Sequence, residues 1–489
     1  MKIIILGAGR VGTSVAESLV SEANDITLVD VDSDTLLLLQ DHLDLRTVVG
    51  NASHPSVLIK AGAKDADLIL AVTQNDETNL VACKLAATMF NTPTKIARIH
   101  SANFLAYPEI FSPENFGVDF VICPEQIVTE YIEKLIEFPE ALQVLDFANG
   151  KVSLVAVRAF HGGPLVGREL RELRQHVPNV DTRVAAIFRK DRSIIPEGNT
   201  VVEAEDEVFF LAAANDIRSV MRELRRMDKP VERIMIAGGG NIGKRLANAL
   251  DKAQEKNYQV KLIEYDKRVC QRLAADLHHT LVLHGDATDE DLLESENIAE
   301  MDMFCALTND DENNIMAALL AKSMGARKVV ALINRSAYVD LVHSGNIDIA
   351  ISPAQVTIGS LLAHVRRGDV AAVHSLRRGA AEALELVTHG DANSSNVVGR
   401  KVAEIKLPKG ATIGAIVRGL AVTESRRWSN DDESNKSKDA PSDYDAQVQV
   451  IIAHHDTVIE AEDHVIVFVI NKKLIRQVEK LFQVGVAFL

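Results

Sequence analysis

Short apolar runs alternate with amphipathic stretches over the first 123 residues, and the same alternation returns at residues 232–352. The apolar runs predict buried strands, whereas the spacing at Val11–Val20 and Glu77–Met89 is typical of helices. The predicted strands of the first region are residues 2–6, 26–29, 68–72, 95–99 and 120–122. Strands that alternate with helices indicate a doubly wound parallel sheet. We therefore expect an α/β, Rossmann-like domain at residues 1–123 and another at 232–352.

A smaller domain with a different pattern is expected after each Rossmann-like domain. The stretch from Pro124 to Phe147 is predicted to be a connecting helix, and its counterpart runs from Pro353 to about Arg367. Beyond each connector, apolar and polar positions alternate as in half-buried strands, for example at residues 151–159. We expect these small α+β domains at residues 143–227 and 372–487.

The two halves share seven short segments in the same order, which indicates duplication of a two-domain unit. Between the last two shared segments, the second half is about 25 residues longer. The extra residues fall around 425–445, where a polar, Ser- and Asp-rich composition predicts a flexible surface loop. The paired segments are Gly7–Gly12 with Gly238–Gly243, Leu28–Asp32 with Leu262–Asp266, Gly50–Ser53 with Gly285–Thr288, Val72–Asn79 with Leu307–Asn314, Ile122–Pro124 with Ile351–Pro353, Leu165–Arg168 with Val397–Arg400, and Glu203–Asp206 with Glu460–Asp463.

Composition excludes several classes of partner. The chain has 53 Lys and Arg against 69 Asp and Glu, a net charge of −16, so we expect no nucleic acid, which requires a cationic face. No apolar run approaches the ~18 residues of a membrane helix, and we expect no signal peptide. None of the four cysteines stands in a CxxC pair, so we expect small buried thiols in a reducing compartment.

The glycine turn near the start of the chain has the pattern of a dinucleotide site. Such a site requires a strand, a GxGxxG turn, a helix and an acidic residue about 20 positions further on. Gly7 permits the tight turn, Gly9 lets the backbone approach a pyrophosphate, and Gly12 allows close packing of helix on strand. The helix that begins near Arg10 offers N–H groups to phosphate. Asp30 can accept both ribose hydroxyls and would repel a 2′-phosphate, which favours NAD over NADP.

The second half repeats this turn, with Glu264 at the position of the acidic residue. One glycine-rich turn is weak evidence, because it can be purely structural, but two copies at the right distance from an acid favour nucleotide binding. The candidate ligand-binding residues in the two turns are Gly7, Ala8, Gly9, Arg10, Val11 and Gly12, and Gly238, Gly239, Gly240, Asn241, Ile242 and Gly243.

Further candidates follow the third and fourth strands, whose carboxyl ends border the ligand crevice of such a sheet. The residues after the third strand could bound the adenine, or Ser53, Asp286 or Thr288 could serve only as helix N-caps. The residues after the fourth strand could face the pyrophosphate or the nicotinamide ribose. For the acidic residues that come next, Asp76–Glu77 and Asp311–Glu312, helix capping is the better interpretation. The candidates are Asn51, Ala52, Asp286 and Ala287 after the third strand, and Thr73, Gln74, Thr308 and Asn309 after the fourth.

Charge distinguishes the two predicted crevices. Arg98 ends the fifth strand, where it could bind phosphate or form a surface ion pair, and its counterpart is Leu332. Arg10 likewise corresponds to Asn241. The first crevice is therefore expected to bind an extra phosphate charge better.

No metal site and no catalytic residue are expected. Adjacent histidines, as at His278–His279 and His454–His455, point to opposite faces of a strand and have no partner at ligand spacing. No His, Lys or Cys is held in common by the two copies as an acid or base for hydride transfer.

The shared segments resemble the RCK (KTN) family of nucleotide-binding domains that regulate potassium conductance. The Rossmann-like regions carry a similar GxGxxG turn, VDVD strand end, GNAS or GDAT turn and VTQNDETN segment, and the LVGR and EAED segments resemble the RCK C-terminal domain. Two such pairs in tandem are similar to the NAD-binding subunits of bacterial Trk potassium-uptake systems.

This resemblance implies a regulatory protein and not an enzyme. It implies NAD⁺ or NADH as ligand, or alternatively ATP or ADP, and an integral-membrane Trk potassium transporter subunit as partner. It also implies a cytoplasmic homo-oligomer, which we expect to be a tetramer, attached peripherally to the inner face of the cell inner membrane through that subunit.

Two alternatives stay open. One is an NAD-dependent dehydrogenase, although the appended domains are small, β-rich and duplicated. The other is an RCK regulator of a potassium efflux channel or antiporter.

Overall fold

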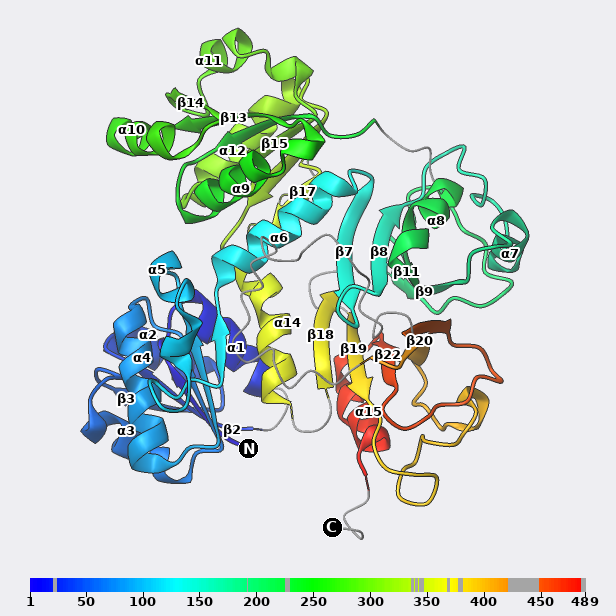
Figure 1. The fold of residues 1–489 in the computed structure, drawn as a ribbon, viewed down its shortest axis with the longest axis horizontal. Coiled ribbons are helices and arrows are strands. Elements are labelled where there is room, and N and C mark those ends of the chain that lie inside the picture. The colour runs from blue at the N-terminus through cyan, green and yellow to red at the C-terminus, as the bar shows by residue number, and fades with distance from the viewer. Residues whose placement is uncertain are drawn as a thin grey trace. The chain divides into compact units, whose positions relative to one another are not determined.

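Two six-stranded parallel sheets form the cores of the two halves (Figure 1). The computed structural model describes residues 1–20, 24–190, 192–224, 229–335, 338, 342, 347–366, 370–376, 381–420 and 448–484, so the predicted loop at 425–445 lies outside the described residues. The first sheet has the order β3-β2-β1-β4-β5-β6, and the second has the equivalent order β14-β13-β12-β15-β16-β17. The predicted doubly wound parallel sheets are confirmed.

The strands and helices of these two domains match in order. The first domain contains β1 (Lys2–Leu6), α1 (Arg10–Val20), β2 (Asp25–Asp30), α2 (Ser33–His42), β3 (Arg46–Val49), α3 (Pro55–Ala61), β4 (Leu68–Ala71), α4 (Asp76–Leu85), β5 (Thr94–Arg98), α5 (Ala102–Leu105) and β6 (Phe120–Ile122). The second contains β12 (Arg233–Ala237), α9 (Asn241–Lys252), β13 (Gln259–Glu264), α10 (Lys267–Asp276), β14 (Leu281–His284), α11 (Glu290–Ser295), β15 (Met303–Ala306), α12 (Asp311–Ser323), β16 (Lys328–Leu332) and β17 (Ile349–Ile351).

Each smaller domain combines a five-stranded antiparallel sheet with one or more short helices. The first sheet has the order β10-β9-β11-β8-β7, and the second has the order β18-β19-β22-β20-β21. Their elements are β7 (Ala141–Phe147), β8 (Val152–Arg158), α7 (Leu173–His176), β9 (Thr182–Arg189), β10 (Arg192–Ile194), β11 (Glu207–Ala213) and α8 (Ile217–Leu224), and β18 (Val370–Leu376), β19 (Ala381–Val387), β20 (Ala411–Arg418), β21 (Gln449–Ile452), β22 (His464–Val469) and α15 (Ile475–Phe482).

The first connecting helix is shorter than predicted. Helix α6 spans Pro124–Glu137, and residues 141–147 form strand β7 instead of a continued helix. Pro139 explains the early end, because proline lacks the N–H that an α-helix requires and disfavours helical backbone in the residue before it. The second connector, α14 (Pro353–Val365), ends two residues before the expected position.

The central strands of the small domains, β8 and β11 in the first and β19 and β22 in the second, are buried on both faces, whereas the sequence pattern predicted one exposed face. In β8, Leu154 and Ala156 join a core that also contains Phe468 of the other small domain. Val155 of the same strand faces the opposite way, into a core closed by Val220 of α8. Alternation along these strands therefore separates two apolar cores and not a core from solvent.

The second connecting helix packs with the first Rossmann-like domain. Residues 1–127 and α14 form one compact unit, and residues 128–352 belong to the other. Within the first unit, α14 packs against α1, and the rings of His364 and Phe120 lie 3.8 Å apart between centroids. In the second unit, Lys328 Nζ donates to the carbonyl oxygens of Pro139 and Ala141 at 2.6 and 3.0 Å.

The EAED segments hold a buried ion pair in each small domain. Arg189 donates from Nε and Nη2 to the two carboxylate oxygens of Asp206, each at 2.8 Å, and the Asp206 side chain has no exposed surface. Arg418 and Asp463 make the same pair with the same distances. The motif thus closes the turn before β11 and β22.

Replacing Arg189 by alanine is expected to lower the free energy of unfolding by about 3–5 kcal/mol, because Asp206 would keep a buried, uncompensated charge. The change is measured from the urea midpoint of the full chain. Arg158→Ala is the matched control, since this arginine is 44% exposed and 3.8 Å from Glu207, and should cost no more than about 1 kcal/mol. Equal effects of the two substitutions would contradict the assignment.

Candidate functional site

The predicted ligand-binding residues of the first half lie at one edge of one sheet. Gly7, Asn51, Thr73 and the side chains of Asp30 and Arg98 stand at or just after the carboxyl ends of β1 to β5, which are neighbours in the sheet. The strand order reverses between β1 and β4, and the crevice at such a reversal is where open α/β sheets bind ligands.

Packing explains two of the three glycines in the first turn. Gly7 has φ +108°, and a Cβ there would lie 3.0 Å from the Thr73 backbone. A Cβ on Gly12 would lie 1.9 Å from the Gly7 carbonyl oxygen. By contrast, a Cβ on Gly9 would meet no atom of the described residues within 4 Å. The backbone at Gly9 therefore faces open space, as the expected approach of a pyrophosphate requires.

The second turn has the same geometry. Gly238 has φ +103° and would place a Cβ 2.9 Å from the Thr308 nitrogen, and a Cβ on Gly243 would lie 1.9 Å from the Gly238 oxygen. A Cβ on Gly240, the counterpart of Gly9, would again meet nothing within 4 Å in the part of the chain that the structure describes.

The strand-end carboxylates are fixed against these turns by backbone N–H groups. Asp30 accepts from the Ala8 N–H at 2.5 Å and from the Asp32 N–H at 2.9 Å, one on each carboxylate oxygen. Glu264 accepts in the same way from Gly239 and Asp266, both at 2.7 Å. Each oxygen retains a lone pair for a ligand hydroxyl. The two acceptor oxygens of each carboxylate therefore fit the two hydroxyl donors of a ribose.

The second acid of the VDVD segment caps the following helix. Asp32 accepts from the N–H groups of Asp34 and Thr35 at the start of α2, and hydrogen bonds from Thr35 lower its pKa. Asp266 does the same for α10, and hydrogen bonds from Val269 and Arg268 lower its pKa. These capping residues stay ionised and hold the strand-end carboxylate in register with the helix.

The polar residues after the third strands are used locally. Asn51 Oδ1 accepts from the N–H and hydroxyl of Ser53, and Asp286 Oδ1 accepts from the same groups of Thr288. The helices that follow begin one step later, with His54 and Asp289 at their N-cap positions. The predicted caps at Ser53, Asp286 and Thr288 are therefore wrong, because these residues form the turn before the helix. Ala52 is buried in the core of the first domain.

Thr73 and Thr308 are committed to a neighbour that the sequence analysis did not single out. Asn79 Oδ1 accepts from the Thr73 N–H and hydroxyl at 3.0 and 2.7 Å, and its Nδ2 donates to the carbonyls of Thr73 and Arg98. Asn314 makes the same four hydrogen bonds around Thr308, and both asparagines are fully buried. The N–H and hydroxyl donors of Thr73 and Thr308 therefore already have partners within the protein, and their contact with a ligand stays a prediction.

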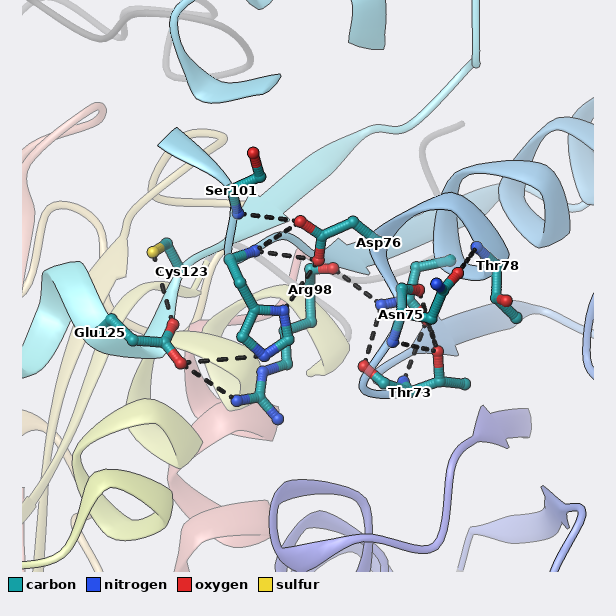
Figure 2. A network of polar contacts seen from close by, with 10 residues as sticks. Thr73, Asn75, Asp76, Thr78, Arg98, Ser101, Cys123 and Glu125 are labelled. Atoms are coloured by element: carbon teal, nitrogen blue, oxygen red, sulfur yellow. Dashed lines mark hydrogen bonds and ion pairs between the residues drawn. The ribbon is translucent and has the colours of Figure 1, made fainter. Parts of the chain in front are cut away.

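The first residue of each acidic pair after the fourth strand has a second task besides its place in the first turn of the helix. Gln74 and Asn309 are exposed beside it. The N-cap of α4 is Asn75, whereas Asp76 accepts from the N–H groups of His100 and Ser101, beyond the end of β5 (Figure 2). Asp311 binds the N–H groups of Asn334 and Arg335 in the second half. The predicted position of both acidic pairs in the first turn of the helix is confirmed, although the N-cap residues are Asn75 and Asp310. The Asp76 and Asp311 carboxylates in addition join two loops that follow neighbouring strands.

Arg98 forms an ion pair, and its partner is a residue that sequence reasoning missed. Its Nη2 lies 3.3 Å from Glu125 Oε1, and the two side chains are only 17% and 12% exposed (Figure 2). Cys123 donates from Sγ to the other oxygen of Glu125 at 3.6 Å. The signal in the sequence was the shared ICP and ISP segments, which align Glu125 of the first half with Ala354 of the second. The second half therefore lacks this carboxylate, just as it has Leu332 in place of Arg98.

Similarity to known proteins decides the family. The model of the TrkA-N domain matches residues 3–124 and 234–353, and that of the TrkA-C domain matches residues 154–225. The chain is 56% identical to the Trk system potassium uptake protein TrkA of Halomonas elongata and 56% identical to that of Vibrio alginolyticus, over 100% of each chain. The chain belongs to the TrkA family. The TrkA protein of Haemophilus influenzae is 49% identical, also over 100% of both chains.

Solved structures agree on the fold of this TrkA-family chain. The crystal structure of the GsuK RCK domain superposes with a TM-score of 0.58 at 18% identity and covers 98% of this chain and 94% of its own. The GsuK channel bound to NAD gives a TM-score of 0.58 at 17% identity, with coverage of 98% and 78%. The predicted RCK architecture of two Rossmann-like domains, each followed by a small α+β domain, is confirmed.

Gly239 and Glu264 are expected to depend on each other. A Cβ on Gly239 would lie 3.0 Å from Glu264 Oε2 and 2.4 Å from Leu273 Cδ1, whereas the first turn combines Ala8 with the shorter Asp30. Gly239→Ala should therefore displace the carboxylate and weaken any ligand bound at the second turn. Adding Glu264→Asp should restore part of the affinity, because the contact with Leu273 Cδ1 remains. Calorimetric titration of the single and double variants with NADH measures this. Gly198→Ala in the first small domain, where a Cβ would lie no closer than 3.8 Å to Arg171 Cβ, is the control for folding.

Proposed function

We propose that this chain is a nucleotide-sensing regulatory subunit of a Trk-type potassium uptake transporter. The relatives that match over their whole length are named as potassium uptake proteins of the Trk system. The observation that carries the nucleotide part is the anchored carboxylate beside an open glycine turn, present twice. One neighbouring structure of the same fold is a channel bound to NAD, which is in keeping with this ligand class.

Each crevice would hold NAD⁺ or NADH through contacts that the residues can make without rearrangement. Asp30 or Glu264 would accept the ribose hydroxyls, and the N–H groups of the first turn of α1 or α9 would bind the pyrophosphate above Gly9 or Gly240. The nucleotides that could bind here differ from one another in negative charge and in size. Adenine nucleotides such as ATP or ADP share the adenosine part and would use the same carboxylate.

Regulation follows if the ligand binds one conformation of the assembly more tightly than another. To shift a conformational equilibrium from 1:99 to 99:1 requires about 5.5 kcal/mol of differential binding, which several crevices can divide among them. Helix α1, whose first turn would meet the phosphates, packs against α14. Because α14 leads along the chain into the second small domain, a ligand that moves α1 acts on that connection.

The partner we propose is the integral-membrane subunit of the transporter, bound at the cytoplasmic face of the inner membrane. None of the helices in the described ranges is both long and apolar enough to cross a bilayer. We also propose that four chains assemble into a homo-oligomer. In this arrangement the ligand is sensed and not converted.

Removing the strand-end carboxylates tests the crevices. Asp30→Ala and Glu264→Ala should each weaken NADH binding at one crevice by roughly 10- to 100-fold, because a hydrogen bond to a charged group contributes about 1.5–3 kcal/mol. Isothermal titration of the full chain with NADH, NAD⁺, ATP and ADP measures this, with Asp34→Ala, an exposed acid on α2, as the matched control. If neither variant changed binding, the crevice assignment would be wrong.

The regulatory role and the dehydrogenase alternative give opposite results in one assay. The purified chain should leave NADH absorbance unchanged with candidate carbonyl substrates, and it should co-purify with a Trk membrane subunit. Steady conversion of the cofactor, or co-purification with an efflux channel or antiporter in its place, would contradict the proposal.

A further inference from the structure

The C-terminal end of α6 is held by cations from two other domains. Lys328, the first residue of β16 in the second Rossmann-like domain, donates from Nζ to the carbonyl oxygens of Pro139 and Ala141 at 2.6 and 3.0 Å. Arg218, on α8 of the first small domain, donates from Nη2 to the carbonyl oxygen of Glu137 at 3.0 Å. Carbonyl groups at the end of a helix lack intrahelical partners and lie at the negative end of its dipole, so positively charged donors suit them.

This end of α6 is enclosed as well as bonded. Glu140, which lies between the two carbonyl groups that Lys328 contacts, is 3% exposed, and Ala141 is fully buried. The guanidinium of Arg218 also lies over the ring of Phe138, 4.8 Å from its centroid. Hydrogen bonds away from water are stronger than exposed ones, so these contacts fix the position of the helix end.

The other end of α6 belongs to the first Rossmann-like domain. The helix begins at Pro124, two residues after the end of β6, at the carboxyl edge of the sheet where the first crevice lies. Residues up to Ile127 form a compact unit with the first domain, and residues from Val128 belong to the unit that contains the second. One uninterrupted helix of 14 residues, about 21 Å long, crosses this boundary. A displacement of its start is therefore carried to its end.

The second connecting helix makes the reverse crossing. It follows β17 of the second Rossmann-like domain, yet α14 packs against α1 of the first. The connector that follows each Rossmann-like domain thus packs with the other one. The contact made by Lys328 is not duplicated from the same position, because Thr94 is the first residue of the equivalent strand β5.

We propose that Lys328 couples the two crevices of one chain, because it passes a displacement of α6 to β16 when a ligand binds at the first crevice. The inference rests on the proposed function, since it requires a nucleotide in that crevice. Strand β16 ends at Leu332, whose carbonyl oxygen accepts from Asn314 Nδ2 at 2.9 Å. Asn314 also holds Thr308, whose backbone packs against the second glycine turn. A shift of β16 therefore reaches the rim of the second crevice.

This coupling is reciprocal. A ligand at either crevice must change the affinity of the other by the same factor, and factors of about 5 to 150 are typical of coupled sites. We expect a factor of about 5, at the lower end of this range, because a single side chain makes the connection.

Hydrogen–deuterium exchange of the full chain tests the transmission. In a Glu264→Ala background, NADH at concentrations that fill the first crevice leaves the weakened second crevice largely empty, so a change in the second Rossmann-like domain must be transmitted. NADH should change the amide exchange of residues 307–314 and 328–332. In the Glu264→Ala/Lys328→Met variant this change should disappear, because methionine keeps the length of the side chain but cannot donate to the carbonyl groups.

Two variants separate coupling from a general effect on the fold. Lys328→Arg retains a charged donor and should restore the response. Lys261→Met is the matched control, since Lys261 Nζ donates to the carbonyl oxygen and carboxylate of Glu296 at 2.9 and 2.8 Å, within the second Rossmann-like domain. This variant should leave the response of residues 328–332 unchanged.

Calorimetric titration supplies a second measurement, which does not require the methionine variant to fold. The NADH isotherm of the unmodified chain should depart from the sum of the Asp30→Ala and Glu264→Ala isotherms by the expected coupling factor. Additive isotherms, an unchanged exchange in the second domain, or a response that survives in Lys328→Met would each overturn the inference and leave the crevices in place. A chain that retains both acids yet binds no NADH would overturn the proposed function itself.

Discussion

The hydrogen bond from the glycine-turn backbone to the acid at the end of the next strand is the constraint on which both crevices depend. It links β1 to β2 in the first half and β12 to β13 in the second, at the edge where a ligand would lie. The turn can approach the acid only because glycines such as Gly7 and Gly238 have no Cβ, which would collide with the neighbouring backbone. The two copies make the same contact with different residues. The first combines Ala8 with Asp30, and the second combines Gly239, which lacks the methyl group, with the longer Glu264.

The duplicated chain has kept its scaffolding contacts and changed its charges. Asn79 and Asn314 hold equivalent strand ends with equivalent hydrogen bonds, and the buried pair of Arg189 with Asp206 recurs as Arg418 with Asp463. These contacts satisfy buried polar groups, and losing one partner leaves the other uncompensated, so they tolerate little change. The ion pair at the first crevice rim is subject to no such structural requirement, as the second half shows by lacking it.

The small domains show how one strand pattern can have two meanings. Their strands are apolar at successive positions because α8 covers one face of the first sheet and the other small domain contributes to the core on its opposite face. Within this chain, therefore, the two small domains are each other's partner. An isolated copy would expose the face that Leu154 and Phe468 now share.

The sequence by itself determined the repeat, the sheet class and the identity of the strand-end acids, because these depend on local periodicity and on spacing along the chain. It could not determine which polar groups are free for a ligand. Thr73 looked available until the fold brought Asn79 back onto it, and Arg98 gained Glu125 from a helix 27 positions away. The end of α6 and the packing of α14 on the first domain were likewise decided by tertiary structure, since a helix pattern records which face is apolar but not what covers it.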